Sequence, residues 1–155
     1  MTREGGVDVI VRALRGDDRA AWEPLWQGYL AFYETPLDDE LTDLVFQRLT
    51  DDGYAPLAGL VAEVDGVLRG FAHTQTHPST WSAQLDCYLE DLFVTPDARG
   101  AGVGRALIEA IADEGRDLGW RKIHWLTDTD NATAQRLYDE VAVQADQRRY
   151  TLDLG

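Results

Sequence analysis

Apolar positions in the first third of the chain change from the spacing of a strand to the spacing of helices. Val7 to Leu14, in which valines alternate with other residues, predicts a strand. Two helices are predicted next, one capped by Gly16-Asp17-Asp18 and one opened by Asp38-Asp39-Glu40. Their apolar faces recur every three or four residues and consist of Trp22, Leu25, Trp26, Tyr29, Leu30 and Tyr33, then of Leu41, Leu44, Val45 and Leu49.

Three strands are predicted in the middle of the chain. Leu57 to Val64 and Val67 to Thr76 are joined by Asp65-Gly66, a favoured two-residue hairpin turn. The polar segment from His77 to Ser82 predicts a loop. Tyr88 to Val94, rich in aromatic and branched residues, predicts the third strand.

The last third alternates helices and strands. A helix is predicted from Val103 to a stop at Gly119, followed by a strand from Lys122 to Thr127. Asp128 to Asn131 is a polar turn that caps a helix with Ala134, Leu137, Tyr138 and Val141 on one side. Arg148 to Leu152 predicts a closing strand. The element order β-α-α-β-β-β-α-β-α-β indicates an α/β fold around one mixed sheet, in a single domain over residues 1–155.

Composition narrows the possible partners. The net charge of −14 argues against nucleic acid, since phosphate contacts need clustered Lys and Arg, and it fits either a cationic substrate or plain solubility. We expect no membrane partner and a cytoplasmic location, because no apolar run reaches membrane length and Met1 to Gly5 lacks the apolar core of a signal peptide. Cys87 is the only cysteine, and no His and carboxylate trio has metal-ligand spacing, so we expect a buried thiol and no metal.

A glycine-rich loop separates the third strand from the next helix. Arg99-Gly100-Ala101-Gly102-Val103-Gly104 follows the turn at Thr95-Pro96-Asp97. Such a loop leaves backbone N–H groups unpaired at a helix N-terminus, which favours an anion such as a diphosphate. The glycines are one residue too close for a dinucleotide fingerprint, and Gly104-Arg105-Ala106 lacks the Lys and Ser or Thr of a P-loop.

The Arg-Gly-x-Gly-x-Gly loop resembles the acetyl-coenzyme A loop of the GCN5-related N-acetyltransferases. A second motif, Asn131-x-x-Ala134-x-x-Leu137-Tyr138 after the Trp125 strand, resembles the other half of that family's signature. Asn131, Ala134 and Tyr138 share one helix face, although a simple cap and a core residue are the alternatives for Asn131 and Tyr138. The resemblance implies a mostly antiparallel mixed sheet with helices on both faces. It is strong from Tyr88 to Tyr138, and the glycine and phenylalanine that usually follow are missing.

The resemblance implies acetyl transfer from acetyl-CoA to a primary amine. It implies that a bulged strand presents backbone N–H groups to the cofactor, and that Tyr138 protonates the leaving thiolate. The expected cofactor-binding residues are Leu92, Phe93, Val94, Arg99, Gly100, Ala101, Gly102, Val103, Gly104, Arg105, Asn131, Ala134 and Tyr138. One or two rings of the Trp22–Tyr33 stripe are candidates for lining an acceptor pocket.

Glu90 is the candidate base, acting through water. Leu89-Glu90-Asp91 resembles the strand of the spermidine/spermine acetyltransferases. Strand alternation places Glu90 and Asp91 on opposite faces, so one of them faces the acceptor, and Asp91 or His73 is the alternative base. His77 and His124 are given no role.

The predicted function is N-acetylation of a small cationic amine such as a polyamine, a lysine analogue or an amino acid. Acetylation of a protein amine or an aminoglycoside, and a non-catalytic acyl-CoA sensor, stay open. A homodimer is common in the resembled family, so a homodimer is possible here, and the sequence leaves the oligomeric state open.

Overall fold

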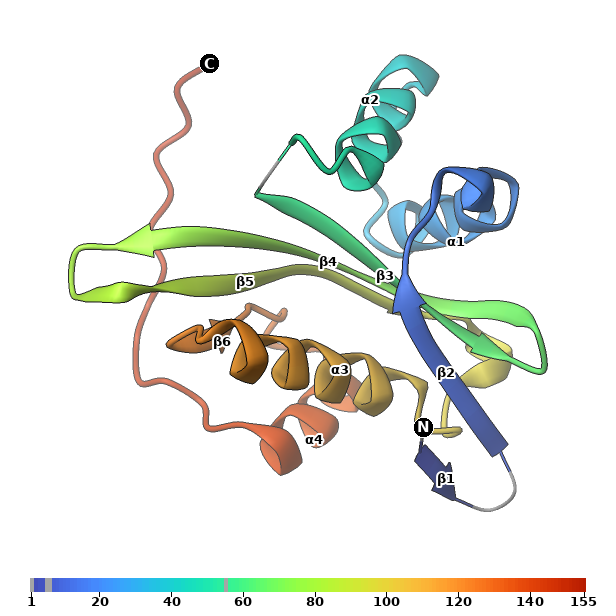
Figure 1. The fold of residues 1–155 in the computed structure, drawn as a ribbon. Helices are drawn as coiled ribbons and strands as arrows, with labels where there is room; N and C mark the ends of the chain where they lie inside the picture. Colours follow the sequence, from blue (N-terminus) through green and yellow to red (C-terminus); the bar gives the residue numbers. More distant parts are fainter. Residues whose placement is uncertain (1, 5–6, 55) are drawn as a thin grey trace.

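The computed structural model describes residues 2–4, 7–54 and 56–155. The expectation that Met1 to Gly5 lacks the core of a signal peptide lies partly outside these residues, because Met1 and Gly5 are not among them. Within the described residues, the chain forms one six-stranded sheet and four helices (Figure 1). The strands are β1 (Thr2–Glu4), β2 (Val7–Ala13), β3 (Leu57–Val64), β4 (Val67–Ser79), β5 (Ser82–Val94) and β6 (Lys122–His124). The helices are α1 (Arg19–Phe32), α2 (Asp39–Thr50), α3 (Val103–Leu118) and α4 (Ala132–Val141), with short 3-10 turns at Gly16–Asp18 and Pro96–Ala98.

The sheet follows chain order from β1 to β6 and is antiparallel except for the parallel pair β5–β6. Figure 1 shows α1 and α2 over one face and α3 and α4 over the other. A mixed, mostly antiparallel sheet with helices on both faces is the predicted fold, and it is confirmed. None of the helices in the described ranges is long and apolar enough to cross a membrane.

Two apolar clusters hold the layers together. On the α1 and α2 face, Trp22 of α1 and Phe71 of β4 are fully buried in one cluster. On the other face, Leu107 and Ile111 of α3 pack on β2 to β5 in the second cluster. The predicted α1 stripe faces the sheet up to Leu30, because burying it removes apolar area from water, and Tyr33 at its end is exposed. On α2 the predicted face is wrong in part: Leu41 and Leu44 are exposed, and the buried residues are Thr42, Phe46 and Leu49.

A β-bulge in β5 changes which side chains face each cluster. His73 pairs with Asp91, but the next residue of β4, Thr74, pairs with Leu89, which leaves Glu90 without a partner residue. Leu89 before the bulge and Leu92 after it both pack on the α3 face. A regular strand would place these two residues on opposite faces, so the extra residue resets the alternation.

The structure differs from the predicted strands in four places. A short strand, β1, precedes the predicted first strand. The predicted loop from His77 to Ser82 is mostly strand, because β4 and β5 stay paired up to their turn. β6 ends at His124 instead of Thr127. The closing strand predicted from Arg148 to Leu152 is wrong, since residues 142–155 contain no helix or strand and pair with no strand of the described sheet.

Candidate active site

A groove of about 460 Å³ lies where the end of α1, the end of β5, the glycine loop and α4 meet. It lies beside the point at which β5 and β6 separate, since their pairing covers only Asp86 to Tyr88 on β5. The lining residues are Tyr29, Phe32, Tyr33, Leu92, Phe93, Val94, Ala98, Arg99, Gly100, Gly102, Val103, Gly104, Arg105, Asn131, Thr133, Ala134, Leu137, Tyr138 and Glu140.

The glycine loop presents backbone N–H groups to this groove. Gly100 and Gly102 have φ of 86° and 81°, a left-handed conformation that strains any residue with a Cβ. Gly102 is the N-cap of α3, and among the described residues no side chain caps this helix. The first helical hydrogen bond runs from the Ala106 N–H to the Gly102 carbonyl, so the N–H groups before Ala106 have no acceptor within the helix. With Arg99 and Arg105 also in the lining, the loop suits a diphosphate.

The end of β5 presents a second row of N–H groups. The Thr95 N–H donates to the Arg69 carbonyl at the β4 edge, 2.8 Å away. Because N–H groups of alternate residues point to the same edge of a strand, those of Leu92 and Val94 point away from β4, into the gap between β5 and β6. They are suitably placed to bind a carbonyl oxygen that gains negative charge.

α4 supplies the opposite wall. Asn131 is its N-cap and accepts a hydrogen bond from the Ala134 N–H at 3.3 Å, so the capping interpretation holds while Asn131 also lines the groove. The Tyr138 ring packs edge-on against Trp125 with 5.4 Å between ring centroids. Burial, with a smaller contribution from Tyr33, raises the pKa of the Tyr138 hydroxyl above 10.0. Tyr138 therefore holds its proton at neutral pH.

The groove brings together nearly all the residues predicted for the cofactor. Ala101 is the exception: its N–H donates to the Ala98 carbonyl and its side chain packs on the core, so it shapes the loop from behind. The groove is also lined by residues that are not among the predicted cofactor residues: Phe32, Tyr33, Thr133, Leu137 and Glu140. The aromatic stripe does contribute Tyr29 and Tyr33 to the lining.

Glu90 and Asp91 lie next to the groove on one face of the sheet. Glu90 is exposed and accepts a hydrogen bond from Gln75 at 2.8 Å. Asp91 contacts His73 at 2.9 Å. Because His73 and Gln75 are two residues apart on β4, they share a face, and so do the carboxylates bound to them. The prediction of opposite faces is wrong, since the bulge places consecutive side chains on the same side.

Other candidate groups lie apart from the groove. Nε2 of His77 and Nε2 of His124 are 2.8 Å apart and share a hydrogen bond. No group of three His, Cys, Asp or Glu residues in the described chain could hold a metal ion. Cys87 is buried, as predicted, and burial raises the pKa of its thiol to about 11.

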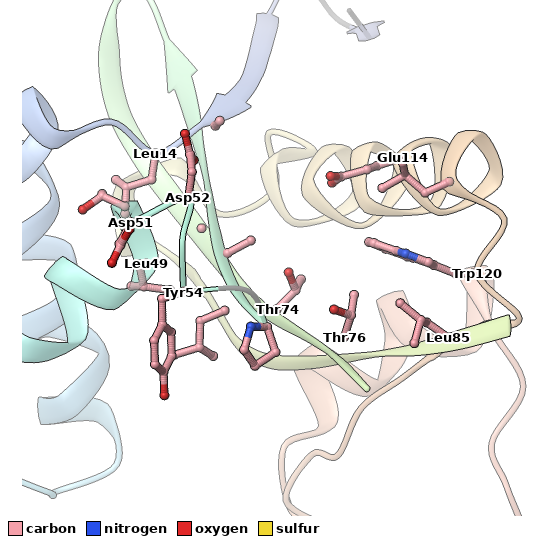
Figure 2. A pocket seen from close by; sticks show the side chains of 17 residues that line it. Leu14, Leu49, Asp51, Asp52, Tyr54, Thr74, Thr76, Leu85, Glu114 and Trp120 are labelled. Carbon is pink, nitrogen blue, oxygen red and sulfur yellow. The ribbon is translucent and has the colours of Figure 1, made fainter. Parts of the chain in front are cut away.

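A second cavity, of about 490 Å³, contains none of the predicted cofactor residues. Figure 2 shows it between the loop after α2, with Asp51 and Tyr54, and the region of Glu114 and Trp120. Leu14, Leu49 and Leu85 are apolar, and Asp51, Asp52 and Glu114 are acidic. The described lining of this cavity therefore lacks the cations that a diphosphate requires. The groove at the glycine loop is therefore the candidate cofactor site.

Comparison with known proteins relates the chain to acetyltransferases. Residues 22–142 match the model of the acetyltransferase (GNAT) family. The chain is 35% identical over 143 residues to D-amino-acid N-acetyltransferase HPA3 of Saccharomyces cerevisiae, covering 92% of this chain and 89% of that protein. The structure resembles ribosomal-protein-alanine N-acetyltransferase of Brucella melitensis with a TM-score of 0.81 and 25% identity, over 95% of this chain and all of that one. The aminoglycoside acetyltransferase AAC(6')-Iy, in complex with a CoA bisubstrate analogue, shares the fold with a TM-score of 0.81 and 20% identity, over 96% and 99% of the two chains.

Proposed function

The chain belongs to the acetyltransferase (GNAT) family and is an N-acetyltransferase, and on this premise we propose that its acceptor is the primary amine of a small cationic molecule, either an amino acid or a polyamine. The observation that carries the proposal is the pair Glu90 and Asp91, two carboxylates on one face of the bulge beside the groove. Two neighbouring negative charges attract an ammonium group. The similarity to a D-amino-acid N-acetyltransferase favours an amino acid, and the Leu89-Glu90-Asp91 strand favours a polyamine.

The groove fits acetyl-CoA, the acetyl donor. The N–H groups of the glycine loop, with Arg99 and Arg105, would hold the pyrophosphate, and Asn131 and Ala134 would border the pantetheine arm. The N–H groups of Leu92 and Val94 would bind the thioester oxygen as it gains charge. No metal is needed for this chemistry.

Three groups of the chain would carry the proton and charge movements of direct transfer. Glu90 accepts, through water, the proton that the ammonium must lose before its nitrogen can attack. The nitrogen then bonds to the acetyl carbon while the backbone N–H groups stabilise the oxyanion. As the carbon–sulfur bond breaks, Tyr138 gives its hydroxyl proton to the departing sulfur. The nitrogen then releases its second proton through water, which leaves the neutral amide and protonates Tyr138 again.

The test is CoA release, followed by thiol colour, with acetyl-CoA and a panel of D- and L-amino acids, polyamines, lysine peptides and aminoglycosides. We expect turnover with free amino acids or polyamines and none with either of the other two classes. Tyr138→Phe and Gly102→Glu are run beside the wild type to show that the signal comes from this groove. Turnover confined to peptides or aminoglycosides would overturn the choice of acceptor, and binding of acetyl-CoA without any turnover would favour a sensor.

We also propose a homodimer that forms through the C-terminal segment. Tyr150, Leu152 and Leu154 alternate with polar residues, as in a strand, and they are 89%, 83% and 94% exposed. Such apolar residues favour pairing with a free sheet edge, and β6 is the last strand of the described sheet. Light scattering should give a dimer for the full chain and a monomer for a chain ending at Gln147; equal masses would contradict the proposal.

We also propose that the protein is located in the cytoplasm. The single cysteine forms no disulfide within the chain and is buried, so the fold does not depend on an oxidising compartment.

A further inference from the structure

A chain of three hydrogen bonds crosses the interface between α1 and the β4–β5 pair. Nε1 of Trp22 lies 3.2 Å from Nε2 of His73, and Nδ1 of His73 lies 2.9 Å from Oδ2 of Asp91. The Tyr29 hydroxyl donates to the other carboxylate oxygen, Oδ1, at 2.7 Å. Asp91 is thus fixed at both oxygens by side chains from two different elements.

The donors fix the protonation of His73. An indole N–H can only donate, so Nε2 of His73 must be the acceptor and carry no proton. The remaining proton of the neutral ring is then on Nδ1, from which it is donated to Asp91. His73 is 3% exposed and stacks on Phe71 with 4.4 Å between ring centroids, so its ring is held in place.

Asp91 accepts at both oxygens, which is the behaviour of an ionised carboxylate. Its side chain is only 18% exposed. In residues 2–4, 7–54 and 56–155, the one basic side chain within ion-pair distance of Asp91 is His73, whose Nε2 accepts the Trp22 N–H. A largely buried carboxylate ordinarily has a cation beside it. No lysine or arginine of the described residues pairs with Asp91, and an amine ligand would supply the cation.

Asp91 is also close to the reacting centre. It is adjacent to Leu92, whose N–H points into the gap between β5 and β6, and its partner Tyr29 lines the groove. The Tyr29 and Tyr33 rings meet edge to face with 5.0 Å between centroids, which provides an aromatic wall of the kind that cations favour. Burial and the charge of Asp91 raise the pKa of the Tyr29 hydroxyl, so it stays a donor.

We propose that Asp91, oriented by Tyr29 and by the Trp22–His73 pair, is the binding site for the ammonium group of the acceptor, and that it holds the reacting amine beside the thioester. This inference rests on the proposed function. It separates the roles of the two carboxylates: Asp91 binds the cation, and Glu90, exposed to water at the bulge, takes the proton.

The test compares a cationic acceptor with an acceptor whose amine is neutral at the assay pH, such as hydroxylamine. Asp91→Asn should raise KM for the cationic acceptor about 10- to 100-fold and change kcat by less than about 3-fold, since a contact to a charged group is lost in binding. KM for the neutral acceptor should stay within about 2-fold. Asp117→Asn, an exposed change on α3, is the matched control and should leave both KM values unchanged.

Two further variants test the orienting contacts. Tyr29→Phe and Trp22→Phe each remove one donor from the chain and keep an aromatic ring, and each should raise KM for the cationic acceptor less than Asp91→Asn does. Acetyl-CoA affinity by calorimetry, unchanged in every variant, shows that the fold and groove are intact. An equal rise of KM for cationic and neutral acceptors, or no rise at all, would overturn the inference. A wild type without amine turnover would instead overturn the proposed function.

Discussion

Arg105 and Glu140 form an ion pair between the first turn of α3 and the last turn of α4. Both side chains line the groove in which the loop N–H groups would hold a diphosphate. Glu140 therefore pairs with Arg105, a cation that could otherwise bind the anionic cofactor. Glu140 also adds a negative charge to the same groove. Binding of the cofactor must compete with this pair.

Glu140→Gln should tighten acetyl-CoA binding. The substitution frees Arg105 and removes a repulsive charge, and we expect Kd to fall about 3- to 10-fold at low salt. Calorimetry at low salt and at 0.5 M salt measures the effect, which should shrink as salt screens the charges. Asp139→Asn, at the exposed neighbouring position, is the control. Weaker binding in Glu140→Gln would mean that Glu140 helps to orient Arg105.

Gly102→Glu should abolish acetyl-CoA binding by placing a charged side chain where the pyrophosphate would lie. Gly119 allows a matched control at the other end of α3. Gly102 and Gly119 have φ of 81° and 76°, and a Cβ at either would meet no atom within 4 Å, so the same substitution strains both backbones alike. Gly119→Glu should keep wild-type affinity. Equal affinity in the two variants would contradict the assignment of the loop.

The cofactor groove could be predicted because its residues form local motifs. Gly102 and Gly119 mark the ends of α3, and each has the left-handed conformation that favours glycine. The acceptor side depends on contacts between distant elements. The resemblance implies a bulge in this strand, but the residue pattern along one strand does not show that the extra residue is Glu90. Plain alternation therefore predicts the two carboxylates on opposite faces.

Cross-strand pairing also determined where the strands end. His77 lies in a segment whose composition is typical of a loop, yet it pairs with Asp86 of β5, because the partner strand satisfies its backbone. The segment from Arg148 to Leu152 shows the opposite case. It has the pattern of a strand but no partner in the described sheet, so its apolar residues stay exposed.

Tyr138→Phe should lower kcat about 100-fold, the usual scale for losing a general acid, and leave the Kd of acetyl-CoA within about 2-fold. The phenol is protonated below its pKa, which burial raises above 10.0. The wild type should therefore show no fall of kcat from this group between about pH 7 and pH 9. Pre-steady-state measurement of acetyl transfer checks both expectations. Wild-type turnover in the variant would remove Tyr138 as the acid.

Glu90→Gln should reduce kcat/KM most at low pH, where the ammonium form of the acceptor is most abundant and deprotonation is hardest. The measurement is a pH profile from about pH 6 to pH 9 with one cationic acceptor. Glu109→Gln on α3 is the control for loss of one exposed charge. A reduction that is the same at every pH would point to Asp91, His73 or bulk water as the proton acceptor.

Asp18→Asn should destabilise the fold near the start of α1. The Asp18 carboxylate is buried and accepts hydrogen bonds from the Arg12 guanidinium at 2.8 and 2.9 Å and from the Arg15 N–H at 2.7 Å. Contacts of this charged kind contribute roughly 1.5–3 kcal/mol, so we expect a loss of about 2 kcal/mol in the free energy of unfolding at pH 7. Asp17→Asn, an exposed change one residue earlier, should stay within about 0.5 kcal/mol of the wild type.

The pH dependence of this loss has a definite sign. The Arg12 hydrogen bond, more than any other contact, holds the pKa of Asp18 below 3.8 in the folded chain. The folded state thus binds the Asp18 proton more weakly than the unfolded state does, and the stabilisation is fully present above pH 3.8. It is lost as the pH falls from 3.8 through the lowered folded pKa, so the wild type and Asp18→Asn should converge there in urea unfolding. A difference that persists unchanged below that range would mean that packing of the side chain, and not its charge, stabilises the turn.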